Sequence, residues 1–247
     1  MLKIALIGYG KMGKMVHETA SKFPIEIVSV IDPKVEDCAK EISAETLKDA
    51  QVCIDFTQPD IVLANIRQVC ALHRNLVVGT TGWNEHLEEV TQLVLTAGIG
   101  MLYGSNLSLG MNLFYEIVAR AAEIISSYDE YDCFGLELHH KEKADSPSGT
   151  AKELGKILLS KNKNKKTLQY DKLDRKIKPE ELHFASVRAG YIPGTHIVGF
   201  DSEADTIELT HRLRNRSGLA LGALKAAMWI ADKKGLYTFQ DYIKARV

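Results

Sequence analysis

The first hundred residues alternate short apolar runs with helical segments, and this alternation restricts the fold more than any other feature of the sequence. The runs KIALI (3–7), VCIDFT (52–57) and NLVVGTTG (75–82) are continuous, rich in β-branched residues and separated by helical stretches. Continuous apolar strands joined by helices are typical of a parallel sheet that is covered on both faces. We therefore expect an α/β domain with a Rossmann-type doubly wound parallel sheet.

The pattern changes after residue 108, where strands and helices no longer alternate regularly. A helical segment at about 109–127 precedes the alternating strand CFGLELHH (133–140), and a further helix at about 150–161 follows it. Three more strands with short turns come next, HFASVRAG, THIVGF and DTIELTHRL. Half-exposed strands with short turns are typical of mixed or antiparallel sheets. The sequence therefore predicts a second, smaller α+β domain with an open mixed sheet.

An apolar-faced helix within residues 218–235 lies near the end of the chain and is expected to return to the first domain. We therefore predict one domain of residues 1–108, completed by 217–247, and a second domain of residues 109–216. The Lys-rich stretch KNKNKK (161–166) in the second domain has no interleaved aromatic residues and is interpreted as a solvated loop.

Composition and charge argue against several classes of protein. A formal net charge of −1 lacks the basic excess on which general binding of nucleic acids or anionic membranes depends. The N-terminus is broken by glycine too early for a secretory signal, and no apolar run reaches membrane length. Four cysteines lack CxxC spacing: Cys38, Cys53, Cys70 and Cys133. Because three of them lie in apolar segments, they are expected to be buried, reduced thiols, with metal binding or redox use as the alternative. We therefore expect a cytoplasmic protein.

The turn LIGYGKMG follows the first strand and carries Gly8, Gly10 and Gly13 in G-x-G-x-x-G spacing. In this context the first glycine permits a tight turn, the second lets a pyrophosphate approach the backbone, and the third permits close packing of helix on strand. The free N–H groups of the helix start would hold the phosphates. A tight turn without a ligand is the alternative. The residues expected to bind a dinucleotide are Gly8, Tyr9, Gly10, Lys11, Met12 and Gly13.

Asp32 stands at the end of the second strand, 19 residues after Gly13. An acid at this place accepts hydrogen bonds from both ribose hydroxyls and favours NADH. Lys34 is near enough to reach the additional 2′-phosphate of NADPH. Because the two side chains favour different cofactors, the sequence leaves the choice between NADH and NADPH open.

Polar segments follow three later strands of the predicted sheet, at FTQP (56–59), GTTG (79–82) and GSNLS (104–108). Ligands of open α/β sheets gather at the carboxyl ends of the strands. The glycines and small polar groups of these segments are therefore expected to line the nicotinamide, although each segment alone is equally well explained as a strand-to-helix turn.

Two adjacent histidines, His139 and His140, are followed by Lys143 in the stretch ELHHKEKADSPSGTAKEL (137–154). Consecutive side chains of a strand point to opposite faces, so His139 and His140 are not expected to hold one metal ion, and we predict no metal site. Lys143 follows His139 by four positions, past the expected strand end, so the two can converge on one pocket. Histidine titrates near neutral pH, which suits a proton donor to a substrate that accepts hydride from a nicotinamide.

Downstream of these residues, Thr150 and Glu153 have capping-box spacing and predict a helix start, with Ser148 and Gly149 just before it. Free N–H groups at a helix start, together with a histidine and Lys143, make a receptor for a small molecule rich in carboxylates. Helix capping without a ligand is the alternative explanation of these residues.

Five stretches, in order across nearly the whole chain, resemble the bacterial dihydrodipicolinate reductase family, now called 4-hydroxy-tetrahydrodipicolinate reductase, of the diaminopimelate route to lysine. They are LIGYGKMG, VVGTTGW, SNLSLGMN, ELHHKEKADSPSGTA and SVRAGYIPGTH. The motif H-H-x-x-K-x-D-x-P-S-G-T-A is far more specific than the glycine pattern. This chain departs from many members at Ser146, where they have alanine. Its glycine turn is also one residue shorter than in some members, which shifts the expected pyrophosphate contacts by about one position.

The resemblance implies a homotetramer of two-domain subunits, in which the second domain binds the substrate and forms the tetramer. It implies NADH or NADPH as cofactor and a cyclic dicarboxylate substrate, 4-hydroxy-2,3,4,5-tetrahydrodipicolinate, which hydride reduces with loss of the 4-hydroxyl as water. By the same resemblance His139 is the proton donor, Lys143 assists it or orients substrate, His140 contacts substrate, and Ser148–Thr150 hold a carboxylate. With the strand-end argument, the expected cofactor contacts are Phe56, Gly79, Thr80, Thr81, Ser105, Asn106, Leu107 and Ser108.

Two rival functions share part of this pattern. Another two-domain oxidoreductase acting on a small acid would keep the glycine turn but would not need H-H-x-x-K before S-G-T. A non-catalytic dinucleotide sensor would have no reason to place a proton donor beside an anion site. The sequence leaves open whether four further residues act in function, in buried structure or in tetramer contacts: Arg188, His196, His211 and Arg216.

Overall fold

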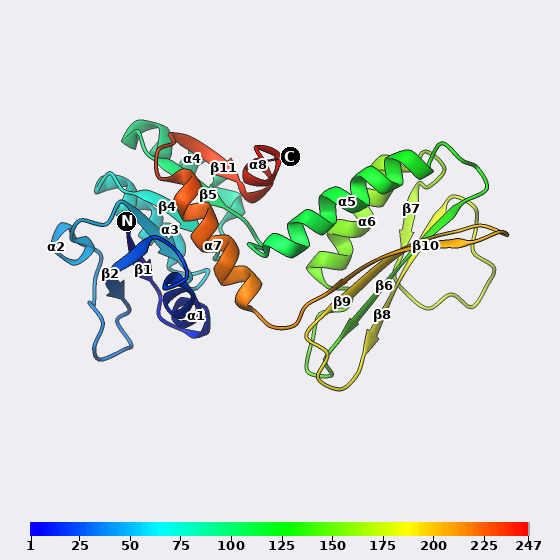
Figure 1. Ribbon diagram of the computed structural model, residues 1–247, viewed down its shortest axis with the longest axis horizontal. Helices are drawn as coiled ribbons and strands as arrows, with labels where there is room; N and C mark the ends of the chain where they lie inside the picture. The colour runs from blue at the N-terminus through cyan, green and yellow to red at the C-terminus, as the bar shows by residue number, and fades with distance from the viewer. Residues whose placement is uncertain (247) are drawn as a thin grey trace. The chain divides into compact units, whose positions relative to one another are not determined.

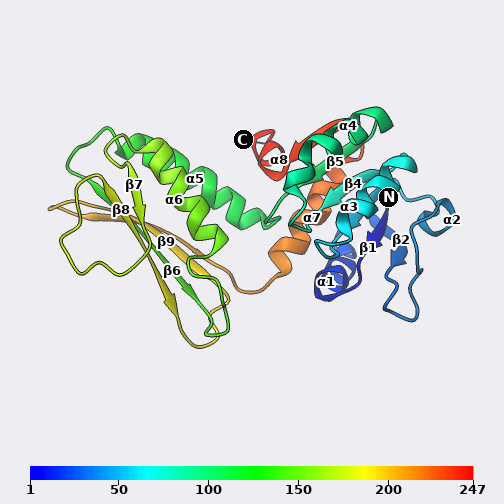
Figure 2. The same cartoon turned by 180° about the vertical axis from the view of Figure 1, so that it is seen from behind.

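A computed structural model describes residues 1–246 of the chain and divides it into two compact units. The N-terminal unit comprises residues 1–112 and the segment that begins at Arg216, and the C-terminal unit comprises Leu113–Asn215. Figures 1 and 2 show the elements of each unit from opposite sides. The functions assigned above to the two domains remain predictions.

The N-terminal unit contains a six-stranded sheet in the order β11-β5-β4-β3-β1-β2, with every neighbouring pair parallel. This arrangement confirms the predicted doubly wound fold. The strands are β1 (Leu2–Ile7), β2 (Ile25–Ile31), β3 (Val52–Asp55), β4 (Asn75–Val78), β5 (Gly100–Tyr103) and β11 (Gly235–Thr238). The helices are α1 (Lys11–Ala20), α2 (Ala44–Leu47), α3 (Val62–Ala71), η1 (Asn84–His86), α4 (Leu87–Ala97), α7 (Ser217–Ile230) and α8 (Phe239–Lys244).

Alternate residues of β1 face two separate cores, which explains why its sequence is continuously apolar. Ile4 and Leu6 pack with α1, α7 and α8 on one face of the sheet. Ala5 and Ile7 pack with α2, α3 and α4 on the other face. The helix α7, predicted to return to the first domain, therefore completes one of its two cores.

The C-terminal unit contains a five-stranded sheet in the order β10-β9-β6-β8-β7. Strand β6 pairs parallel with β8 and antiparallel with β9, so the sheet is mixed, as predicted. Figures 1 and 2 both show α5 and α6 side by side along one face of this sheet. The elements are α5 (Leu109–Ile125), which begins in the N-terminal unit, β6 (Asp132–His139), α6 (Gly149–Lys161), β7 (Thr167–Gln169), β8 (Glu181–Arg188), β9 (Thr195–Asp201) and β10 (Thr206–Arg212).

The prediction of a solvated loop at 161–166 is wrong for one of its lysines. Lys165 is only 6% exposed, and its Nζ donates to the carbonyl oxygens of Pro179 and Glu181, each at 2.8 Å. The same ammonium group forms an ion pair with Asp132 at the start of β6. A buried lysine whose donors are satisfied in this way joins three segments of the unit.

The four cysteines are free and buried, as predicted. Burial raises the pKa of Cys53 to about 12 and the pKa values of Cys70 and Cys133 to about 11. None of the helices in residues 1–246 combines the length and apolar character needed to cross a membrane.

Candidate functional site

The glycine turn has the geometry that its sequence predicts. Gly8 adopts a positive φ of 91°, and its N–H donates to the carbonyl oxygen of Ile31 at 2.8 Å. A Cβ at Gly13 would lie 2.1 Å from the carbonyl oxygen of Gly8, so only glycine permits this approach of α1 to the turn. Gly10 is the N-cap of α1 and has open space where a Cβ would stand. The turn therefore leaves room for an anion at the helix start.

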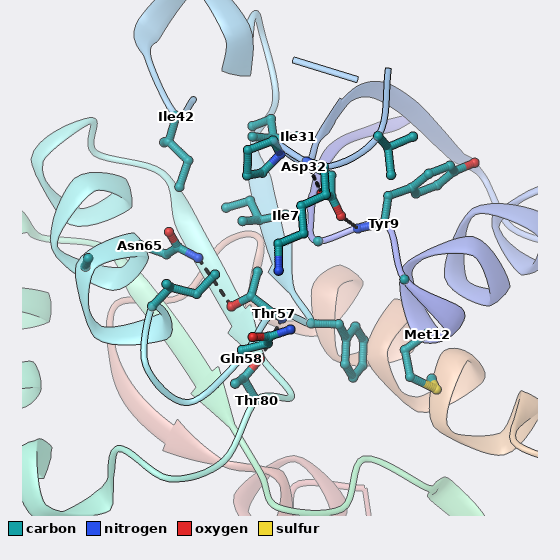
Figure 3. A pocket seen from close by; sticks show the side chains of 18 of the residues that line it. Ile7, Tyr9, Met12, Ile31, Asp32, Ile42, Thr57, Gln58, Asn65 and Thr80 are labelled. Carbon is teal, nitrogen blue, oxygen red and sulfur yellow. Dashed lines mark hydrogen bonds between the residues drawn. The ribbon is translucent and has the colours of Figure 1, made fainter. Parts of the chain in front are cut away.

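Asp32, which follows the end of β2, forms a hydrogen bond to this turn. Its Oδ2 accepts the backbone N–H of Tyr9 at 2.8 Å, and its Oδ1 accepts the backbone N–H of Lys34 at 2.8 Å. Figure 3 shows the carboxylate beside Tyr9 at the edge of a pocket. Each oxygen retains a further lone pair, so the carboxylate can also accept a ribose hydroxyl.

A cavity of about 970 Å³ lies along the carboxyl ends of the strands in the N-terminal unit. Its volume is at the upper end of the usual range for small-molecule sites, about 300–1,000 Å³. Lys40, Ile42 and Asn65, which sequence reasoning did not select, also line it, and so does Gln58 of the predicted segment 56–59. The predicted residues that line it are Gly8, Tyr9, Gly10, Lys11, Met12, Asp32, Lys34, Phe56, Gly79, Thr80 and Thr81.

The sequence reasoning missed a buried carboxylate beneath this cavity. Asp55, the last residue of β3, is fully buried, and its Oδ1 accepts from the Thr57 N–H and from the hydroxyls of Thr57 and Thr80 at 2.8–3.0 Å. Its Oδ2 accepts from Asn65 Nδ2 at 2.8 Å. Burial raises the pKa of Asp55, although these hydrogen bonds oppose the shift. Asp55 therefore fixes the loops that follow β3 and β4, both of which line the cavity.

The third predicted segment, 105–108, is not among the residues that line this cavity. Leu107 is buried in the core beneath α7. Asn106 Oδ1 accepts the N–H of Ser108 at 2.9 Å, and Asn112 Nδ2 donates to the carbonyl oxygens of both residues at 2.8 Å. These contacts order the segment that leads into α5, and the cofactor contacts assigned to Ser105, Asn106, Leu107 and Ser108 remain predictions.

In the C-terminal unit, His139 is the last residue of β6 and belongs to a buried cluster around Glu137. Its Nε2 lies 3.3 Å from Glu137 Oε2, and His196 Nε2 lies 3.5 Å from the same oxygen. His196 stands opposite Glu137 in the register of β9 with β6, so neighbouring strands bring these side chains together. Glu137 and His196 were not among the residues chosen for catalysis or binding.

Glu137 is fully buried and remains an anion. Arg188 donates to its Oε1 at 2.8 Å, and the Ser148 N–H donates to the same oxygen at 3.0 Å. Burial raises the pKa of Glu137, but donors from His196, Ser148 and Arg188 outweigh this effect and hold the pKa well below its usual value. Burial lowers the pKa of His139, and the negative charge of Glu137 opposes this shift. The positive charges of His196, Lys143 and Arg188 add smaller effects that lower the pKa further.

Lys143 and Asp145 form an ion pair in the loop after β6, with Lys143 Nζ 2.6 Å from Asp145 Oδ1. The lysine side chain is 22% exposed, whereas that of Asp145 is 58% exposed. Arg188 donates to the Asp145 carbonyl oxygen at 2.6 Å and so ties this loop to the Glu137 cluster. An anion that approaches Lys143 therefore competes with Asp145 for the ammonium group.

The start of α6 differs from its prediction, because the N-cap is Ser148 and not Thr150. Ser148 Oγ accepts the N–H of Ala151 at 3.1 Å and also forms a short hydrogen bond to Glu137 Oε2. Its polar groups are thus engaged inside the unit, and the substrate contact assigned to it remains a prediction. Gly149 is exposed and Thr150 half-buried, beside the hydroxyl of Tyr115, whose pKa burial raises to about 12.

One group of three side chains within residues 1–246 is close enough together to suit a metal ion. It comprises Glu137, His139 and His196, whose ligand atoms all lie within 4.8 Å of one another. The Arg188 guanidinium bonded to Glu137 opposes a second cation there.

His140 follows the end of β6 and lies outside this group. His211, opposite His196 on β10, stacks near Phe114 with ring centroids 5.8 Å apart, and Arg216 precedes α7 as its N-cap.

Two family descriptions cover almost the whole chain. Residues 2–107 match "Dihydrodipicolinate reductase, N-terminus", and residues 110–243 match "Dihydrodipicolinate reductase, C-terminus". The chain is 35% identical over 245 residues to the 4-hydroxy-tetrahydrodipicolinate reductase of Christiangramia forsetii, with 98% of each chain covered. It is 35% identical over 246 residues to the enzyme of the same name from Staphylococcus aureus, covering 97% of this chain and 100% of the other.

Solved structures share the fold. The dipicolinate-bound dihydrodipicolinate reductase of Paenisporosarcina sp. TG-14 is similar with a TM-score of 0.77 and 21% identity, covering 98% of this chain and 99% of that chain. The diaminopimelate dehydrogenase of C. glutamicum is similar with a TM-score of 0.53 and 14% identity, covering 97% and 93%.

Proposed function

Since the chain belongs to the dihydrodipicolinate reductase family and performs the NAD(P)H-dependent reduction of that family in lysine biosynthesis, we propose how its own residues carry out the reaction. The substrate is 4-hydroxy-2,3,4,5-tetrahydrodipicolinate. One hydride from the nicotinamide and one proton are added, and the 4-hydroxyl leaves as water to give 2,3,4,5-tetrahydrodipicolinate. The observation that carries this proposal is the placement of His139 beside a buried carboxylate and the start of α6.

The cofactor occupies the cavity of the N-terminal unit. The N–H groups at the start of α1 hold its pyrophosphate, with Lys11 as a nearby cation. Asp32 accepts from the ribose hydroxyls, and Lys34 pairs with the 2′-phosphate when the cofactor is NADPH. When bound, the nicotinamide supplies the hydride.

His139 is the proton donor, and the residues near it hold the substrate. Its pKa is low in the free protein, and the arrival of a dianionic substrate favours the charged imidazolium. Lys143 binds one substrate carboxylate in place of Asp145, and the free N–H groups around Gly149 and Thr150 bind a carboxylate at the start of α6. His140 contacts the substrate from the end of β6.

The open face of the C-terminal sheet forms the contacts of a homotetramer. Phe134, Leu136 and Leu138 are half-buried and alternate with the residues of β6 that face inward. Val187, opposite Leu138 on β8, is 41% exposed. An apolar sheet face of this kind is typical of a protein–protein contact. Light scattering of the purified protein tests this assembly, and a monomer at micromolar concentration would contradict it.

The variant His139→Gln tests the catalytic assignment. Loss of a general acid usually costs about 10²–10⁴-fold, so turnover is expected to fall by this factor. NADH binding, measured by fluorescence, is expected to be unchanged because the cavity belongs to the other unit. Turnover that stays at the wild-type rate would refute the assignment of His139.

A further inference from the structure

Glu137 is the buried carboxylate beside His139, and no step of the proposed reaction uses it directly. It is fully buried near the end of β6, where an unpaired charge would be strongly destabilising. Such an acid is tolerated when its neighbours satisfy its hydrogen bonds.

The two oxygens of Glu137 have different surroundings. Oε1 accepts from Arg188, from the Ser186 hydroxyl at 2.8 Å and from the Ser148 N–H. Oε2 accepts from the Ser148 hydroxyl and faces the imidazoles of His139 and His196, at 3.3 and 3.5 Å. The donors on Oε1 therefore fix the carboxylate so that Oε2 points toward the two rings.

The two nitrogens of His139 are also distinct. Nε2 is buried and has no aligned hydrogen-bond partner, although Glu137 Oε2 is 3.3 Å away. Nδ1 lies on the edge of the ring that faces Gly194, where a Cβ would stand 3.3 Å from it, and it forms no hydrogen bond within residues 1–246. It is therefore the nitrogen left free to act on a substrate. Hydrogen bonds of catalytic groups are often poorly aligned without substrate and tighten when it binds.

We propose that Glu137 is the positioning residue of the proton donor: it holds a proton on Nε2 of His139, and Nδ1 is the nitrogen that passes a proton to the substrate. The hydrogen bond made by one ring nitrogen of a histidine determines which protonation state the other presents. A fixed carboxylate also stabilises the imidazolium that the donor must become. This proposal rests on the proposed role of His139.

The same carboxylate links the donor to the predicted carboxylate-binding helix start. Glu137 accepts both the N–H and the hydroxyl of Ser148, and Ser148 in turn caps α6 through the Ala151 N–H. Gly149 and Thr150 follow directly. One buried anion thus sets the positions of the proton donor and of the helix start relative to each other within this unit.

Glu137→Gln tests the proposal in a double-mutant cycle with His139→Gln. The amide keeps the shape of the carboxylate but lacks its charge and one acceptor. We expect kcat to fall at least about 10-fold, and by no more than the whole general-acid contribution of about 10²–10⁴-fold. Because Glu137 acts through His139, adding Glu137→Gln to His139→Gln is expected to cost little more. If Glu137→Gln lowers kcat by the same factor in the His139→Gln background as it does in the wild-type protein, the proposal is overturned.

The matched control is Glu181→Gln. Glu181 is another buried acid of this unit, 5% exposed and paired with Arg175 at 2.7 Å, and neither ion pairs nor hydrogen bonds join it to a histidine in residues 1–246. We expect a lower Tm but kcat within about twofold of wild type. An equal loss of kcat in Glu181→Gln would show that any broken buried ion pair slows the enzyme, and would overturn the specific role of Glu137.

Nitrogen NMR of the wild-type protein gives a second test that does not depend on a variant folding. With ¹⁵N-labelled histidine at a pH where the ring is neutral, the His139 signals are expected to show the proton on Nε2; the His139→Gln spectrum assigns them. A proton on Nδ1 would overturn the proposal. If His139→Gln alone retained full turnover, the catalytic role of His139 would fail instead, and the two failures are thereby distinguished.

Discussion

Asp145→Asn is expected to strengthen substrate binding, because Asp145 competes with the substrate for Lys143. The pair is 2.6 Å apart, with side chains 22% and 58% exposed. An ion pair with this exposure contributes about 0–1 kcal/mol. Release of Lys143 therefore lowers KM for the substrate by up to about fivefold, since a tenfold change corresponds to about 1.4 kcal/mol. The value of kcat is expected to change little, because Asp145 does not contact His139.

The assay is the steady-state KM for substrate at saturating NADPH. Asp174→Asn is the matched control, because the Lys172–Asp174 pair is 3.9 Å apart and more than 80% exposed at both side chains; its KM is expected to equal that of wild type. Lys143→Ala is expected to act in the opposite direction, with a higher KM and a lower rate. An Asp145→Asn variant whose KM is unchanged or higher would refute the competition and show that Asp145 holds Lys143 in place for the substrate.

Lys34→Ala is expected to raise KM for NADPH by about fivefold and leave KM for NADH within about twofold, because only NADPH carries a 2′-phosphate; equal changes in both would contradict its role. Gly13→Ala places a Cβ 2.1 Å from the Gly8 carbonyl oxygen and is expected to lower the free energy of unfolding by about 1–3 kcal/mol; an unchanged Tm would contradict this. Burial lowers the pKa of His139, and a donor must be protonated, so kcat/KM is expected to fall as pH rises through a pKa below about 6.5. A pH profile that is flat from about pH 5 to 8 would contradict a histidine donor.

The doubly wound sheet and the glycine turn could be predicted because their signals are local. Strand β1 reads as an apolar run, and the residues of the turn that follows it are adjacent in sequence. The required conformations, a positive φ at Gly8 and a close approach at Gly13, restrict those positions to glycine. Local constraints of this kind are visible in one sequence.

The clusters that support the sites could not be predicted because tertiary pairing creates them. Glu137 meets His196 only through the register of β6 with β9, and Asp55 meets Thr80 only where the loops after β3 and β4 converge. One signal was available: Glu137 shares the inward face of an alternating strand with His139, and an acid at a buried position requires partners.

Two local predictions failed because tertiary contacts outweighed them. Thr150 has capping-box spacing, yet Ser148 is the N-cap of α6. The Ser148 hydroxyl accepts the Ala151 N–H, while the N–H and hydroxyl of Ser148 are held by the buried Glu137. Lys165 belongs to a Lys-rich stretch that looks solvated, yet the carbonyl oxygens of Pro179 and Glu181 and the carboxylate of Asp132 satisfy its ammonium group in the interior. Composition alone does not reveal such partners.

The most direct test of the proposed chemistry is the oxidation of NADH and of NADPH by the wild-type protein, followed by absorbance. The substrate is unstable and is made in the cuvette from pyruvate and aspartate semialdehyde by a coupled synthase. We predict rapid oxidation that depends on the synthase, and the two cofactor rates show whether Asp32 or Lys34 dominates. No substrate-dependent oxidation, with NADH binding intact by fluorescence, would contradict the account.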